Sequence, residues 1–203
     1  MLATAGLLPA YPFPMDDARF ALHHQAWKGI SPRYEAYALL LPGDPSFICQ
    51  PHVCDAHCCR KFSVSVGEAD RARMERETAL APVQFLESEA GTPITLPLAK
   101  PYLLRRAENR CAMLAPDLGC SVYSGRPDAC RQYPYQVLFA SVEGGIARPF
   151  RDEALALLAS DSGAGPVALL VRHIECPGFT GEPLSSADWR TLRQSTLALQ
   201  FAP

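Results

Sequence analysis

Long apolar runs are absent from this sequence. No stretch of the 203 residues approaches the roughly 18 consecutive apolar residues that a membrane-spanning helix needs. The first seventeen residues hold no Lys or Arg, and Pro9, Pro12 and Pro14 interrupt their apolar character. A secretory signal needs a positive start and an unbroken apolar core. We therefore predict a cytoplasmic protein with no membrane partner.

The chain also lacks a large excess of positive or negative charge. Nineteen Lys and Arg residues are balanced by 21 Asp and Glu residues, which leaves a formal net charge of -2. Proteins that bind nucleic acid concentrate positive charge, so we predict no nucleic-acid partner. The chain is 48% hydrophobic and 20% charged, as ordinary globular domains are. Its length is enough to bury a core without the help of disulfides.

Several catalytic motifs are missing as well. The chain has no G-x-G-x-x-G, no phosphate-binding P-loop and no C-x3-C-x2-C radical signature. Its Ser, His and Asp residues show no order typical of hydrolases. The motifs therefore leave open whether the protein is an enzyme.

Cysteine is what the sequence has in quantity. Four cysteines lie within eleven residues as C-x4-C-x3-C-C, three follow as C-x8-C-x9-C, and one stands near the C-terminal end. The eight are Cys49, Cys54, Cys58, Cys59, Cys111, Cys120, Cys130 and Cys176. Cytoplasmic thiols are kept reduced, which favours metal binding over disulfides. The adjacent pair Cys58 and Cys59 could be bridged only with strain.

Thiolates are soft ligands that select zinc, Cu(I) and iron–sulfur clusters. Four sulfurs hold one zinc ion or one cubane cluster, so eight fill two sites, or one site with spares. We predict that all eight bind metal, with an iron–sulfur cluster of the 4Fe–4S kind favoured over zinc. For any single cysteine the alternative is a small buried apolar residue. His52, His57 and His173 lie nearby and are interpreted as polar residues rather than ligands.

The most specific stretch runs from Cys120 to Pro134 and reads C-S-V-Y-S-G-R-P-D-A-C-R-Q-Y-P. With F-I-C-Q-P-H-V-C-D-A-H-C-C-R upstream and a late Cys-Pro-Gly at Cys176, it resembles the zinc- or iron-chelating cysteine-cluster family called CxxCxxCC or YkgJ-type. The resemblance covers roughly residues 47–179 and implies metal chelation. The gaps in the first group are longer here than the family's C-x2-C-x2-C-C. Cys58, Cys59, Cys120 and Cys130 align best.

The same resemblance extends distantly to the flagellin lysine N-methylases, which carry such a cluster in a longer chain. It implies an alternative function, that of a protein-modifying enzyme. A third hypothesis is a structural zinc protein that serves as an interaction scaffold. A protein partner is compatible with each hypothesis, but the sequence identifies none.

Two arginines flank Cys130. We predict that Arg126 and Arg131 neutralise an anionic centre or donate N–H groups to its sulfurs, and that Arg60 does likewise. The alternative is pairing with surface carboxylates. Tyr123 and Tyr133 are predicted to shield the site from solvent, although ordinary core packing would explain them equally well.

Nineteen prolines divide the chain into short elements. We predict helices over residues 16–28, 67–80 and 152–160, and a last helix capped by Ser185 or Ser186. Residues 62–66 and 167–171 are strand candidates, and residues 82–101 are expected to be extended or looped. The expected fold class is α+β. We expect a small irregular single domain, organised around a cysteine-ligated metal site rather than a regular sheet, with helices at the C-terminal end.

The expected organisation along the chain has three segments. Residues 1–46 form an N-terminal extension that packs on the core, residues 47–179 form the cysteine-cluster metal-binding domain, and residues 180–203 form the C-terminal helix.

Overall fold

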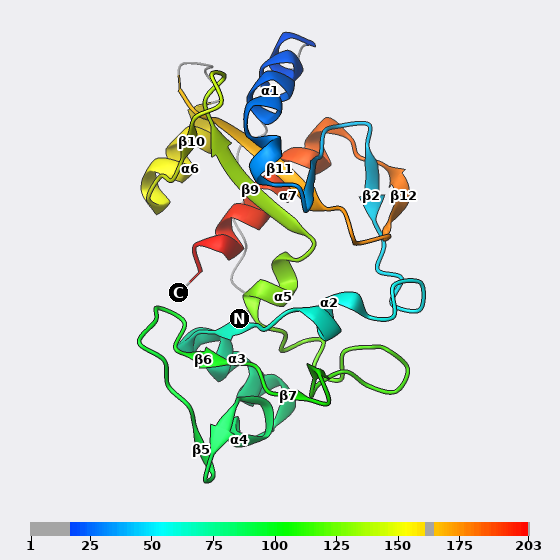
Figure 1. Ribbon diagram of the computed structural model, residues 1–203, viewed down its shortest axis with the longest axis vertical. Helices are drawn as coiled ribbons and strands as arrows, with labels where there is room; N and C mark the ends of the chain where they lie inside the picture. The colour runs from blue at the N-terminus through cyan, green and yellow to red at the C-terminus, as the bar shows by residue number, and fades with distance from the viewer. Residues whose placement is uncertain (1–16, 161–164, 203) are drawn as a thin grey trace, which may run out of the picture.

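A four-stranded antiparallel sheet builds one half of the molecule, the upper half in Figure 1. The computed structural model describes residues 17–160 and 165–202. The strand order is β1-β11-β9-β10, and each neighbouring pair is antiparallel. The strands are β1 (Tyr37–Leu39), β9 (Tyr135–Ala140), β10 (Ile146–Ala147) and β11 (Val167–His173).

Helices cover both faces of this sheet, because side chains of a strand alternate between its faces. Val137 and Phe139 of β9 pack in one apolar cluster with side chains of the helices α6 and α7. Leu138 and Ala140 pack in a second cluster with side chains of the helix α1. The three helices are α1 (Asp17–Ile30), α6 (Arg151–Ser160) and α7 (Ser186–Gln200). We call residues 17–47, 133–160 and 165–202 the sheet half.

The three helices of the sheet half lie close to where the sequence predicts them. Ser185 is the N-cap of α7, and its hydroxyl accepts a hydrogen bond of 3.1 Å from the backbone N–H of Asp188. Trp189 and Leu197 lie on the buried side of that helix. No helix among the described residues is long and apolar enough to cross a bilayer.

Residues 48–132 build the other half of the molecule, which we call the cysteine half (Figure 1). Its strands are two residues long and form three small ribbons: β3 (Ser65–Val66) with β6 (Tyr102–Leu103), β4 (Ser88–Glu89) with β5 (Thr92–Pro93), and β7 (Arg106–Ala107) with β8 (Arg110–Cys111). The helices α3 (Glu68–Thr78) and α4 (Pro82–Phe85) pack with them around a third apolar cluster, which includes Val66, Met74 and Phe85.

Two five-residue helices lie where the halves meet (Figure 1). They are α2 (His57–Lys61) and α5 (Asp128–Gln132). Beside them in the sheet half, β2 (Pro45–Phe47) pairs with β12 (Phe179–Pro183) in a separate ribbon, and a short 3-10 helix, η1 (Ser31–Arg33), follows α1.

The α+β class and the C-terminal helix are confirmed. The regular sheet is a correction to the expectation that a metal site alone organises the centre, because β1, β9, β10 and β11 form their own core. The expected loop over residues 82–101 contains α4 and one ribbon, since Pro82 begins a helix there. The division at residues 46 and 179 stays a prediction.

Candidate metal centre

All eight predicted ligands are free thiols, and they gather at the junction of the two halves. Cys49 is exposed, Cys111 and Cys176 are buried, and the remaining five are partly buried. Seven of them come from the cysteine half. Cys176 follows β11 and is the one that the sheet half supplies among the described residues.

The arginine Arg106 fixes helix α2 on the β7–β8 ribbon. Its guanidinium donates hydrogen bonds to the carbonyl of Phe62 at 2.5 Å and to that of Arg60 at the C-terminal end of α2. It also donates to the carbonyl of Asn109, in the turn of the ribbon, at 2.6 Å. The last carbonyls of a helix have no partner within it, so a cation there is stabilising. This clamp places Cys59, on α2, beside the strand that ends in Cys111.

Four thiols pack against the third apolar cluster. Cys111 is a member of that cluster, and Cys59, Cys120 and Cys130 pack against it. Cys120 is held by a bridge to Leu114, and the next residue in the chain, Ser121, donates its N–H to the carbonyl of Met113 at 2.9 Å.

The late Cys-Pro-Gly turn lies against the start of the first cysteine group. The N–H of Ile48, next to Cys49, donates to the carbonyl of Gly178 at 2.7 Å, as an extension of the β2–β12 ribbon. A side chain at Gly178 would begin 2.5 Å from the ring of Phe47, so only glycine allows this close approach. The ribbon therefore brings Cys176 to Cys49 across more than a hundred residues.

A second link joins the Cys176 turn to helix α2. The ammonium of Lys61 lies 2.9 Å from the carboxylate of Glu175, and Nε2 of His57 lies 3.2 Å from it. His57 is therefore placed beside a carboxylate, as the polar interpretation expects. His52 is exposed, and the buried His173 packs against Tyr133.

Burial dominates the electrostatics of most of the thiols. It raises the pKa of Cys111, Cys120 and Cys176, and it raises the pKa of Cys130 to about 12. The exception is Cys58, whose pKa is lowered to about 7 because the thiol of Cys59 donates a hydrogen bond to it. A bound cation would favour deprotonation at all of these sulfurs.

Beside Arg106, which lowers the pKa of Cys111, Arg126 is a second cation near the thiols. Its positive charge lowers the pKa of Cys49, Cys58, Cys120 and Cys130 against the larger opposing effect of burial at three of them. Its buried Nε has no hydrogen-bond partner within the described part of the chain. The guanidinium stacks 3.8 Å over the ring of Tyr123, which is itself 65% exposed and so gives the thiols little cover.

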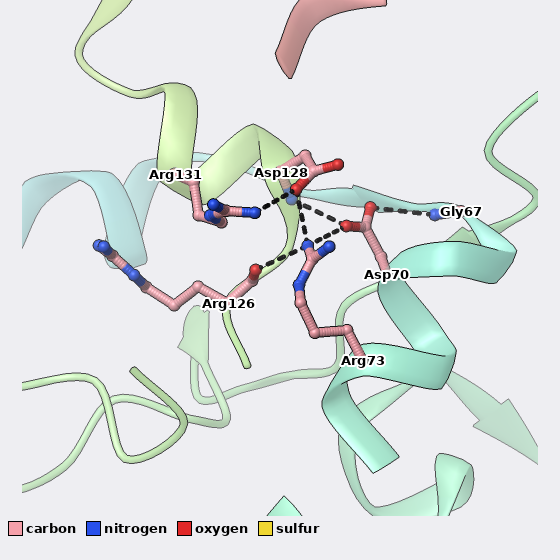
Figure 2. Close-up of polar contacts among 6 residues, drawn as sticks. All are labelled: Gly67, Asp70, Arg73, Arg126, Asp128 and Arg131. Carbon is pink, nitrogen blue, oxygen red and sulfur yellow. Dashed lines mark hydrogen bonds and ion pairs between the residues drawn. The ribbon is translucent and has the colours of Figure 1, made fainter. Parts of the chain in front are cut away.

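The other predicted arginines pair with carboxylates. Arg131 donates to Oδ1 of Asp128 at 3.1 Å, and Arg60 pairs with Asp55 at 3.0 Å. The side chain of Arg126 points away from Asp70 and Asp128, as Figure 2 shows. Arg131 and Arg60 thus pair with carboxylate oxygens, as the alternative expects, whereas the role of Arg126 toward sulfur stays a prediction.

A buried ion-pair network anchors the segment before Cys130 (Figure 2). Arg73 of α3 pairs with Asp70 and, at 2.7 Å, with Asp128 of α5. It also donates to the carbonyl of Arg126 at 2.9 Å, and Asp70 accepts from the N–H of Asp128 at 2.9 Å. Asp70 is fully buried, so these partners compensate the loss of its hydration. Sequence reasoning missed both Asp70 and Arg73, because they lie on an ordinary polar helix, 53 to 58 residues from their partners in the segment before Cys130.

Aromatic side chains cover the thiols on the side of the sheet half. The hydroxyl of Tyr133 is hydrogen-bonded with the thiol of Cys176, and burial raises the pKa of Tyr133. Its ring packs against Phe62 and His173. Tyr133 thus has the shielding position that the sequence suggested.

The thiols share one region without meeting at one point. Within residues 17–160 and 165–202, no three Cys, His, Asp or Glu side chains lie close enough together to hold one ion as they stand. Thiols on loops can close on a metal when it binds, and this movement is part of the coupling between metal binding and folding. The ligand role of each cysteine therefore stays a prediction.

A comparison with protein families gives one match. The model of the family described as a "putative zinc- or iron-chelating domain", CxxCxxCC, matches residues 48–154. The chain belongs to this family. The match includes seven of the eight cysteines, together with Arg126 and Arg131, and leaves Cys176 outside. Comparisons with curated proteins and with solved structures gave no significant match. Membership makes this a protein of a zinc- or iron-chelating family.

Proposed function

We propose that this protein holds iron as an iron–sulfur cluster through its cysteines and uses it to transfer electrons, to sense redox state or to handle metal. One observation carries the proposal. Eight free thiols come from three parts of the chain, four of them pack in or against one apolar cluster, and the charge of Arg126 is near enough to lower the pKa of four. We propose all eight cysteines as the ligand pool.

The residues present fit such a group in three respects. The donors are all soft sulfurs, which select iron–sulfur clusters, zinc or Cu(I). The buried Nε of Arg126 has a hydrogen to donate and no acceptor among the described residues. The apolar cluster and Tyr133 exclude water from the sulfurs, which is how proteins adjust the reduction potential of a cluster.

The spread of the thiols favours iron over zinc. A zinc ion draws four sulfurs to about 2.3 Å from a single point. A cubane takes one thiolate at each of its irons, so its ligands remain further apart. Among the described residues no three of these thiols lie close enough together for one ion, which suits the larger group.

The chain's own residues have separate parts in this proposal. Thiolates hold the cluster, which when bound supplies one-electron transfer. Arg126 offsets the negative charge of four thiolates and can donate an N–H to sulfur. Arg131 acts indirectly. It pairs with Asp128, which belongs to the ion-pair network that positions Arg126.

Free thiols in this number favour a reducing compartment, so we propose the cytoplasm as the location. The protein-modifying alternative stays a prediction, with no observation that favours it over the metal-handling role.

Anaerobic purification followed by metal and sulfide analysis tests the proposal. We expect a brown protein that absorbs at about 400 nm and contains iron and acid-labile sulfide in equal amounts. A matched sample purified in air should lose colour and iron together. A colourless protein with stoichiometric zinc and no sulfide would reject the iron–sulfur cluster and leave a zinc site.

A further inference from the structure

We propose that the eight cysteines form two separate four-sulfur sites, which meet at the peptide bond between Cys58 and Cys59. The inner site consists of Cys59, Cys111, Cys120 and Cys130. The outer site consists of Cys49, Cys54, Cys58 and Cys176. This division rests on the proposed function in one respect only, namely that the cysteines bind metal.

Packing defines the inner site. Its four thiols are those that pack in or against the apolar cluster of the cysteine half. The Arg106 clamp brings the end of α2 to the β7–β8 ribbon, and therefore Cys59 to Cys111. The β-bridge between Leu114 and Cys120 fixes the position of Cys120. The ion pair of Arg73 with Asp128, and its hydrogen bond to the carbonyl of Arg126, fix the turn before Cys130.

The link between the two halves defines the outer site. The hydrogen bond from Ile48 to Gly178 ties Cys49 to the Cys176 turn, and the ion pair of Lys61 with Glu175 ties that turn to α2. Cys54 lies in the connection between these two anchors, with its thiol 3.8 Å from the carbonyl of Pro51. None of these thiols is part of the apolar cluster within the described residues.

Helix geometry allows the adjacent pair to divide when metal replaces the hydrogen bond between its two thiols. Cys58 and Cys59 are consecutive residues of α2, and consecutive side chains of a helix leave its axis about 100° apart. The inner four are complete without Cys58, whereas the outer three need a fourth sulfur. A run of cysteines divided between two clusters is known in two-cluster ferredoxins.

The two proposed centres would be close neighbours. Their ligands Cys58 and Cys59 share one peptide bond in α2, so the centres lie near enough for an electron to pass between them.

Two matched double variants of the full chain test the division. One is Cys111→Ser with Cys120→Ser, and the other is Cys49→Ser with Cys176→Ser. Each is reconstituted anaerobically with ferrous iron and sulfide beside the parent, and metal and sulfide per chain are measured. Tryptophan fluorescence reports on the sheet half, which holds Trp27 and the fully buried Trp189, and hydrogen exchange of α3 reports on the cysteine half, so the two together show whether a variant is folded.

We expect the parent to bind about eight irons per chain and each double variant about half as many. The reduced parent should show spin coupling between two clusters by electron paramagnetic resonance, and both variants should lose it. A variant that keeps the full load, or a folded variant that loses all of it, would overturn the division. If an inner variant does not fold, the single variant Cys49→Ser decides, because Cys49 is exposed and its loss should halve the load.

The result separates the division from the proposed function. If the parent binds two zinc ions and each variant binds one, the division into two sites holds and the iron–sulfur cluster is rejected. A parent with one cluster, held by four cysteines and indifferent to the other four, would retain iron and reject the division. A parent that binds neither metal would reject the proposed function, and the division with it.

Discussion

The two halves of this molecule are held together in different ways. The sheet half has a four-stranded sheet whose alternating side chains feed two apolar clusters beneath helices α1, α6 and α7. The cysteine half has only two-residue strands and one apolar cluster, and cysteines make up part of that cluster. Pairs of two-residue strands contribute little stability by themselves. We therefore expect bound metal to stabilise the cysteine half, as burial of apolar side chains stabilises the sheet half.

Metal removal should separate the halves most clearly. After chelation we expect the local opening free energy of α2, α5 and β8 to fall by about 5 kcal/mol or more, because metal binding and folding are coupled. Amides of β9 and β11 should keep their protection, because their core holds no predicted ligand. Hydrogen exchange of the loaded and the chelated protein measures both. Equal protection of the cysteine half in the two samples would contradict its dependence on metal.

Trp189→Ala should do the reverse and weaken the sheet half. The indole is fully buried, and its Nε1–H donates to the carbonyl of Leu40 at 2.7 Å. We expect a loss of about 4 kcal/mol in urea unfolding, while metal per chain stays at the parent value. Trp189→Phe is the matched control, since it keeps most of the volume and should lose less. Release of metal by Trp189→Ala would show that the halves are not independent.

Asp70→Asn should weaken the cysteine half without touching a thiol. It removes the charge that pairs with Arg73 and leaves that guanidinium with Asp128 alone. We expect a loss of about 3 kcal/mol in the exchange protection of α3 and α5, together with weaker metal retention. Glu68→Gln on the same helix is the control, because Glu68 is exposed and its substitution should change the exchange protection little. If the two variants change exchange protection and metal retention equally, the buried ion-pair network does not stabilise the cysteine half more than an exposed ion pair does.

Arg126→Gln should have the smallest effect. Loss of one positive charge beside the thiolates should weaken metal binding by about 1 kcal/mol, which competition with a chelator can measure. Arg126→Lys keeps the charge and should retain most of the affinity. If the Lys and Gln variants bind metal equally weakly, the shape of the arginine side chain matters and its charge does not.

Local signals accounted for much of this protein. End signals, charge order and, for α7, a one-sided apolar pattern predicted the helices α1, α3, α6 and α7, because ten or more residues leave room for such signals. The α2 and α5 helices escaped prediction, since five residues carry no periodicity. The ribbons of two-residue strands escaped for the same reason.

The sequence by itself determined the chemistry of this protein: eight soft sulfur donors, the Arg-Pro-x-x-Cys-Arg motif and the family that they indicate. Only the tertiary structure decided which thiols are neighbours. It set Cys176 against Cys49 through the β2–β12 ribbon and paired Arg131, but not Arg126, with Asp128 (Figure 2). Ligand chemistry resides in single side chains, which any sequence displays. Proximity depends on pairings between distant segments, and no local pattern encodes these.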